Sequence, residues 1–368
     1  MKRSNRSSNF ELLRIIAMLF IVCHHSALYG LLNGSVGIQG GNPVPNQLWN
    51  ITFTGQVVAM FGKAAVDIYV MISGYFLINS KTDLKKSFKK VLFLLAQVYF
   101  YSVLIYLVAV HFNWVNPNDP TVLSQAFLPI IYNTNWFATE YLMLYLIYPF
   151  INASLHSITR KQHYALILIG VFVFSFIQMI FPNFMTYGSY GFLTIFVLFY
   201  VIGAYFRMYS IRHEKLVGCT LFMGGSLILV GILYYYDVLA KTTNNQQYYS
   251  RGFSFAGQYS LIPLLIAAGL VMIFKNINIG SNRVINTISA TTFGIYLIHD
   301  NPIMEEILWK HFLNVPALYL PNSKPFLKSL IIIVPLVFVC CSLIDYVRIL
   351  IFNLVSKIYL KVKNHVKC

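Results

Sequence analysis

Long apolar runs recur along the whole chain, and they constrain its fold more than any other feature. Ten of them have roughly the length that a helix needs to cross ~30 Å of hydrocarbon, and they span about 10–32, 57–78, 91–111, 136–153, 164–181, 190–206, 216–236, 256–274, 287–309 and 329–351. The shorter apolar stretch 122–133 contains Pro129 and is expected to be re-entrant or interfacial. A composition of 58% hydrophobic and 10% charged residues lies outside the range of soluble domains. The sequence therefore predicts an all-α, polytopic integral membrane protein with about ten transmembrane helices.

The distribution of positive charge indicates how these helices are oriented. Basic residues collect on the cytoplasmic side of membrane proteins, and with the amino terminus placed there most of the 27 Lys and Arg fall into 2–6, 81–90, 160–161, 207–215, 275–283 and 348–367. Both termini are thus expected in the cytoplasm, with a tail at 1–9, a membrane domain at 10–351 and a basic tail at 352–368. Dispersed over six segments, the net charge of +16 suits anionic membrane lipid and forms no footprint for nucleic acid.

The first predicted span carries ionisable residues that a simple anchor would not need. Such a group costs about 2.5–3.5 kcal/mol inside a membrane unless it is paired, hydrated or functional. Arg14 and His25 are eleven residues apart, which brings them within about 20° of the same helix face, with His25 about 16 Å deeper. The stripe that they share also contains Glu11, Met18 and Ile21. His24 points about 80° away from Arg14, so the two histidines are not expected to serve one cavity equally well. The ordinary alternatives are that Arg14 extends its side chain to the membrane surface and that His25 is a core histidine without a catalytic role.

Polar residues in the second, fourth and ninth spans are candidates for support or substrate binding. Lys63 and Asp67 are four residues apart and can pair along one face. Ser73 followed by Gly74 permits close helix approach, for which simple packing is the ordinary explanation. The remaining candidates are Trp136, Glu140, Tyr296, His299 and Asp300. Trp136 is also typical of an aromatic belt, whereas an acidic group such as Glu140 is rarely left in an apolar helix without a partner. Pro302 is expected to kink the ninth span.

Taken in order, these residues resemble the membrane acyltransferase-3 family. The resemblance rests on an Arg and a His with ten residues between them, on "DIYVMISGYF", on a Trp-Phe stretch before a Tyr and a Pro, and on "TFGIYLIH" near the end. It covers essentially the whole chain. Arg14 and His25 match the family's essential Arg and His, and Ser73 and Gly74 match its Ser-Gly motif. Tyr69 stands where a Phe is commoner, and no hydrolase-like domain follows the last helix, as in stand-alone members.

The resemblance implies a multi-pass enzyme of the bacterial plasma membrane that moves an acetyl group from cytoplasmic acetyl-CoA to a hydroxyl of a surface or lipid-linked polysaccharide. No metal is expected, and the five cysteines show no metal-ligand or disulfide spacing. Guanidinium binds phosphate in a forked geometry, so Arg14 is the candidate contact for the CoA phosphates. His25 is the candidate general base on the acceptor hydroxyl, with an acyl-imidazole as the alternative. The polar and aromatic segment 240–255 offers groups for a glycan, and an ordinary polar loop is the equal alternative.

Two other classes of function stay open at the level of sequence. A proton-coupled transporter or glycan flippase also needs buried His, Arg and acidic groups, but usually shows repeated halves with broken helices, and no such symmetry is visible here. A purely structural membrane scaffold would leave the alignment of Arg14 with His25 unexplained. The sequence predicts neither the oligomeric state nor the sugar.

Overall fold

The computed structural model describes residues 7–29, 49–80, 84–181, 191–315 and 323–365, and every regular element in these ranges is helical. The elements are α1 (Ser8–Ala27), α2 (Trp49–Ala59), α3 (Gly62–Leu77), α4 (Leu84–His111), α5 (Pro120–Phe127), α6 (Trp136–Ser157), α7 (Arg160–Val171), η3 (Phe172–Ile177), α8 (Gln178–Ile180), α9 (Gly191–Met208), α10 (Glu214–Thr243), α11 (Gln247–Ser254), α12 (Leu261–Lys275), α13 (Arg283–Ser289), α14 (Thr292–His299), α15 (Pro302–Met304), η4 (Glu305–Phe312) and α17 (Ser323–His365). The predicted all-α class is confirmed.

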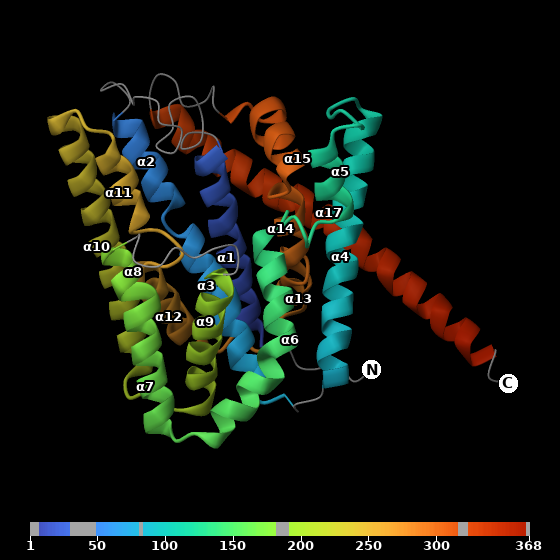
Figure 1. Cartoon of the computed structure of the whole chain (residues 1–368), viewed down its shortest axis with the longest axis horizontal. Helices are drawn as coiled ribbons and strands as arrows, with labels where there is room; N and C mark the ends of the chain where they lie inside the picture. Colours follow the sequence, from blue (N-terminus) through green and yellow to red (C-terminus); the bar gives the residue numbers. More distant parts are fainter. Residues whose placement is uncertain (1–6, 30–48, 81–83, 182–190, 316–322, 366–368) are drawn as a thin grey trace.

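Six helical stretches in the described ranges are long and apolar enough to cross a membrane, and two further apolar helices, Phe192–Met208 and Leu261–Lys275, are shorter. The count of ten spans and the cytoplasmic placement of both termini stay predictions. Apolar side chains that face outward, such as Leu227 on α10 and Ile331 on α17, lie where lipid would cover them. Figure 1 shows α17 crossing the other helices obliquely, with its C-terminal part extending away from them.

Helix α3 lies inside the bundle, packed against α1, α9 and α12. Its contact with α9 is made by backbone: a Cβ on Gly74 would lie 2.1 Å from the carbonyl oxygen of Tyr200, and one on Gly203 would lie 2.0 Å from that of Met71. Only glycine fits at both positions, as in the close crossings of membrane helices. The Ser-Gly motif therefore has a packing role at Gly74.

The predicted ninth span, 287–309, is not one continuous helix. It consists of α13, α14, α15 and η4, with a break after His299. Pro302 has no N–H with which to continue α14, and it begins α15 instead. The side chain of Asn301 caps α15 by accepting from the backbone N–H of Ile303 at 3.0 Å. The expected kink is thus a full interruption, and Asp300 lies in it.

A buried ion pair joins α17 to α4 and α14. Arg348, which the sequence assigns to the basic residues of the cytoplasmic side, is only 4% exposed and lies within α17, which continues past the predicted boundary at 351. Its guanidinium contacts both carboxylate oxygens of Asp345 at 2.7 and 3.0 Å, and the hydroxyl of Tyr101 donates to Asp345 at 2.7 Å. A Cβ on Gly294 would collide with Asp345, so α14 packs directly onto this pair.

Candidate functional site

The break after α14 brings two residues against His25 of α1. Nδ1 of His25 lies 3.0 Å from Nε2 of His299, and its Nε2 lies 3.2 Å from Oδ1 of Asp300. The Tyr29 hydroxyl donates to the same Asp300 oxygen at 2.7 Å, and the Tyr29 ring stacks on the imidazole of His25. All four side chains are buried. We call them the histidine cluster.

The hydrogen bonds of His299 determine how the protons of the histidine cluster are arranged. Nδ1 of His299 lies 2.6 Å from the carbonyl oxygen of Ile295, which only accepts, so this nitrogen carries the proton. In neutral His299 the other nitrogen, Nε2, then accepts, and His25 donates to it from Nδ1. Nε2 of neutral His25 is consequently left with its lone pair, facing Asp300. A proton taken up there would give an imidazolium paired with a carboxylate.

A small cavity of about 30 Å³ borders His25. We call it the histidine cavity; its lining includes Met18, Ile21, Lys63, Trp136 and Tyr296. Its volume has room for one or two water molecules. The ammonium of Lys63 lies 5.2 Å from the centre of the Trp136 ring, with Asp67 and Asp300 as its charged neighbours. The Tyr296 hydroxyl is buried without a hydrogen bond of good geometry to any described residue, although Asp300 is close by.

A much larger cavity, of about 570 Å³, adjoins the first turns of α1 and α4. We call it the basic cavity; its lining includes Glu11, Arg14, Lys89, Lys90 and Gln97. This volume is in the range of small-molecule sites. Tyr69, Phe137 and Phe293 line both cavities. One face of α1 therefore lines two neighbouring spaces, with Glu11 and Arg14 at the basic cavity and Met18, Ile21 and His25 at the histidine cavity.

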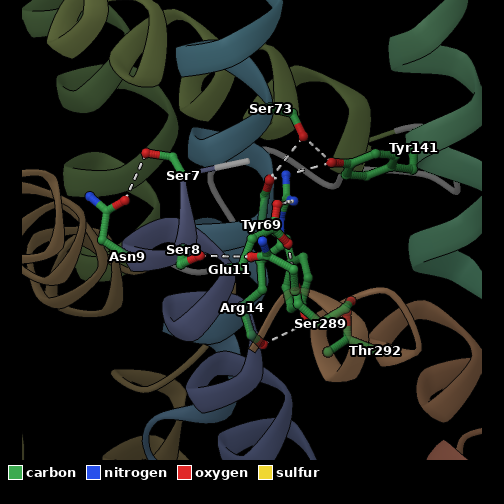
Figure 2. A network of polar contacts seen from close by, with 11 residues as sticks. Ser7, Ser8, Asn9, Glu11, Arg14, Tyr69, Ser73, Tyr141, Ser289 and Thr292 are labelled. Atoms are coloured by element: carbon green, nitrogen blue, oxygen red, sulfur yellow. Dashed lines mark hydrogen bonds and ion pairs between the residues drawn. The ribbon is translucent and has the colours of Figure 1, made fainter. Parts of the chain in front are cut away.

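Arg14 belongs to a polar network that joins α1 to α3 and α13 (Figure 2). Its Nη1 contacts Glu11 at 2.9 Å, and the second carboxylate oxygen of Glu11 accepts from Ser289. The Tyr69 hydroxyl donates to the backbone oxygen of Arg14 at 2.7 Å. The Arg14 side chain is 27% exposed, and Nη1 is its one nitrogen bonded to a neighbour among the described residues. The remaining N–H groups are thus available to a ligand in the basic cavity.

The other residues of the second span have partners different from those expected. Lys63 and Asp67 attract each other electrostatically, but no direct ion pair joins them in the described ranges. Asp67 accepts instead from Gln258 of the segment before α12, which can approach because α3 packs against α12. The Ser73 hydroxyl contacts the carbonyl oxygen of Tyr69 and the hydroxyl of Tyr141, at the edge of the basic cavity (Figure 2).

His24 and Glu140 lie in different positions relative to the two cavities. His24 and His25 both line the histidine cavity, although they lie on different faces of α1. His24 supports the neighbouring turn, with Nδ1 2.7 Å from the carbonyl oxygen of Ala59. Glu140 is buried on α6, but it lines neither the histidine cavity nor the basic cavity and does not contact His25. It is therefore outside the site.

Three cations that line the two cavities could be placed only coarsely from the sequence. The sequence offers Lys63 as a partner for Asp67, and it assigns Lys89 and Lys90 to the basic cytoplasmic segment 81–90. A signal for the two lysines was present, because they are the last residues of a basic cluster that runs directly into an apolar helix. For Lys63 no local signal was present, since its contact with Trp136 joins residues far apart in the chain.

Comparison with known proteins gives one match. A family model described as an acyltransferase domain, that of the acyltransferase-3 family, matches residues 7–345, which is nearly the whole chain. No curated protein and no solved structure matches.

Proposed function

Because the chain belongs to the acyltransferase-3 family, we propose that it transfers an acetyl group from acetyl-CoA to a hydroxyl of a surface or lipid-linked polysaccharide. The observation that carries this proposal is the position of the two neighbouring cavities along one face of α1, with cations at one end and an imidazole at the other. Coenzyme A has the same polarity: charged phosphates at one end and a thioester at the tip of a thin arm.

The basic cavity is the proposed site for the nucleotide part of the donor. Arg14, Lys89 and Lys90 together supply three positive charges, of which Glu11 offsets one. The guanidinium of Arg14 retains free donors for a forked contact with phosphate oxygens. Tyr69, Phe137 and Phe293 line both cavities, and their rings would pack against an uncharged pantetheine arm that reaches toward His25.

His25 is the proposed general base. A hydroxyl placed beside Nε2 supplies the donor that this nitrogen lacks. The acceptor O–H bond gives its proton to Nε2 as the oxygen bonds to the thioester carbon. Asp300 stabilises the resulting imidazolium, and His299 holds the ring by accepting from Nδ1. When the C–S bond breaks, the sulfur leaves with the proton that His25 returns. An acyl-imidazole intermediate is the alternative to direct transfer.

Two groups of the histidine cavity suit the oxyanion that forms in this reaction. The Tyr296 hydroxyl lacks a good hydrogen bond, and Lys63 brings a positive charge to the lining of this small cavity. Donors held ready in such a space are worth about 2.7–4 kcal/mol each in acyl transfer. Trp136 orients Lys63 through the face of its ring.

The test is transfer of label from radioactive acetyl-CoA to candidate polysaccharides by the purified protein. We expect His25→Ala to lower the rate by roughly 10²- to 10⁴-fold, the usual contribution of a general base. The matched control is His163→Ala, which removes another buried histidine bonded to a backbone carbonyl, on α7. Native transfer by a folded His25→Ala variant would overturn the assignment. Glycan uptake into liposomes without transfer of label would indicate a transporter instead.

A further inference from the structure

A second large cavity lies at the opposite end of α4 from the basic cavity. It has a volume of about 570 Å³ and forms where the end of α4 meets α5, α15 and η4. We call it the aromatic cleft and define it by Asn113, Trp114, Gln125, Glu306, His311 and Phe312. Figure 1 shows α5 and α15 together at this end of the molecule, whereas α1 and α4 begin at the other. The mechanism above does not use this cleft.

The lining of the aromatic cleft combines flat apolar rings with uncharged and acidic polar groups. The rings of Trp114 and Phe312 meet edge to face with centroids 5.4 Å apart, and they are 39% and 63% exposed. Phe112 stacks on Trp114 at 5.0 Å and holds it in place. Pyranose sugars present C–H faces that pack on such rings and hydroxyls that bond amides and carboxylates. Asn113, Gln125 and Glu306 supply these polar groups.

Charge separates this cleft from the basic cavity. The basic cavity is lined by Arg14, Lys89 and Lys90, whereas the aromatic cleft has a carboxylate and a single histidine. Lys310, the nearest fixed cation on η4, is already paired with Glu306 at 2.5 Å. An uncharged ligand rich in hydroxyls fits this lining better than a phosphate or another anion does.

Helix η4 is the wall between the aromatic cleft and the histidine cluster. Its Glu306 and Phe312 line the cleft, while its Trp309 is buried and donates from Nε1 to the carbonyl oxygen of His299 at 3.3 Å. Ile303, which also lines the cleft, follows Asp300 by three residues. The helix has π geometry, which is rare and occurs often at functional sites. The cleft is thus one helix away from the proposed general base.

We propose that the aromatic cleft is the acceptor subsite and that it binds an uncharged pyranose unit of the polysaccharide. This proposal rests on the proposed function, because an acceptor subsite has a role only in acyl transfer. Sugar binding itself can be measured without any acyl transfer. Trp114 and Phe312 hold the sugar ring, and Glu306 accepts hydrogen bonds from its hydroxyls. Residues of this subsite would set the affinity for the acceptor and leave the affinity for the donor unchanged.

The direct test is saturation-transfer NMR on the full chain in nanodiscs with neutral tetrasaccharides of glucose, galactose and N-acetylglucosamine. At least one of the three is expected to receive saturation from the protein, and Trp114→Ala is expected to weaken its binding by tenfold or more. The matched control is Tyr235→Ala, which removes an aromatic residue of α10 that is 61% exposed and lies outside the cleft. This control tests whether any exposed aromatic ring at the membrane surface is sufficient for sugar binding.

A second pair of variants isolates the carboxylate. Glu306→Gln and Lys310→Gln break the same ion pair, but only Glu306 lines the cleft. We expect binding to fall at least fivefold in Glu306→Gln and to stay native in Lys310→Gln. Absence of saturation transfer to all three sugars, or equal losses in cleft and control variants, would overturn the acceptor subsite. Sugar binding without any acetyl transfer would support the subsite and count against the proposed function, so the two failures are distinguishable.

Discussion

Replacing Asp300 with asparagine tests whether His25 works as a base whose charged form is stabilised by a carboxylate. The substitution keeps the shape of the side chain and an oxygen that can accept from Tyr29, but it removes the negative charge 3.2 Å from Nε2. At that distance a full charge pair is worth about 5 kcal/mol at an effective dielectric constant of ~20. Loss of one partner of a buried pair typically costs about 3–5 kcal/mol. The expected decrease in kcat is therefore roughly 10²- to 10⁴-fold.

The measurement is acetyl transfer by purified variants under donor and acceptor saturation, together with the KM for acetyl-CoA. Because Asp300 lies at the histidine cluster and does not line the basic cavity, we expect kcat to fall and the KM for acetyl-CoA to stay within about threefold of native. The control is Asp237→Asn, which neutralises another fully buried aspartate, on α10, that lines neither cavity of the proposed active site. A folded Asp300→Asn enzyme that retains more than half of the native kcat would refute the reasoning.

Two further changes probe the donor site and the packing of the bundle. Arg14→Ala should raise the KM for acetyl-CoA by about tenfold or more, since a charge-assisted hydrogen bond contributes roughly 1.5–3 kcal/mol. The KM for the acceptor should stay native. Equal changes in both KM values would contradict a role of Arg14 at the phosphates. Gly74→Ala should destabilise the protein by at least about 1–3 kcal/mol, because its Cβ would lie 2.1 Å from a backbone oxygen of α9. Gly231→Ala on α10, where nothing lies within 4 Å of the added Cβ, should be neutral or stabilising in the same thermal unfolding experiment.

Features that depend on one helix could be predicted from the sequence. The shared face of Arg14 and His25 follows from 100° per residue, which holds whatever surrounds the helix. The interruption near Pro302 follows from a missing N–H, which no packing can restore. In both cases the determining physics lies within a dozen residues of chain.

Features that depend on packing between distant helices could not be predicted. His25 meets His299 across 274 residues, and Asp67 meets Gln258 across 191. The i,i+4 rule favoured pairing Asp67 with Lys63, but such pairs contribute only about 0.2–0.5 kcal/mol and yield to better tertiary partners. Among the acidic candidates for supporting His25, only the path of the chain after α14 distinguishes Asp300 from Glu140.

The small volume of the histidine cavity also bears on the electrical integrity of the membrane. A space with room for one or two water molecules cannot hold the continuous file of water that would conduct ions or protons between two compartments. If the histidine cavity is the reaction centre as proposed, donor and acceptor would meet in it while the bilayer keeps its potential. Enlarging the histidine cavity, for example with Trp136→Ala, would create a leak pathway. Such a leak is measured in cells as a loss of membrane potential.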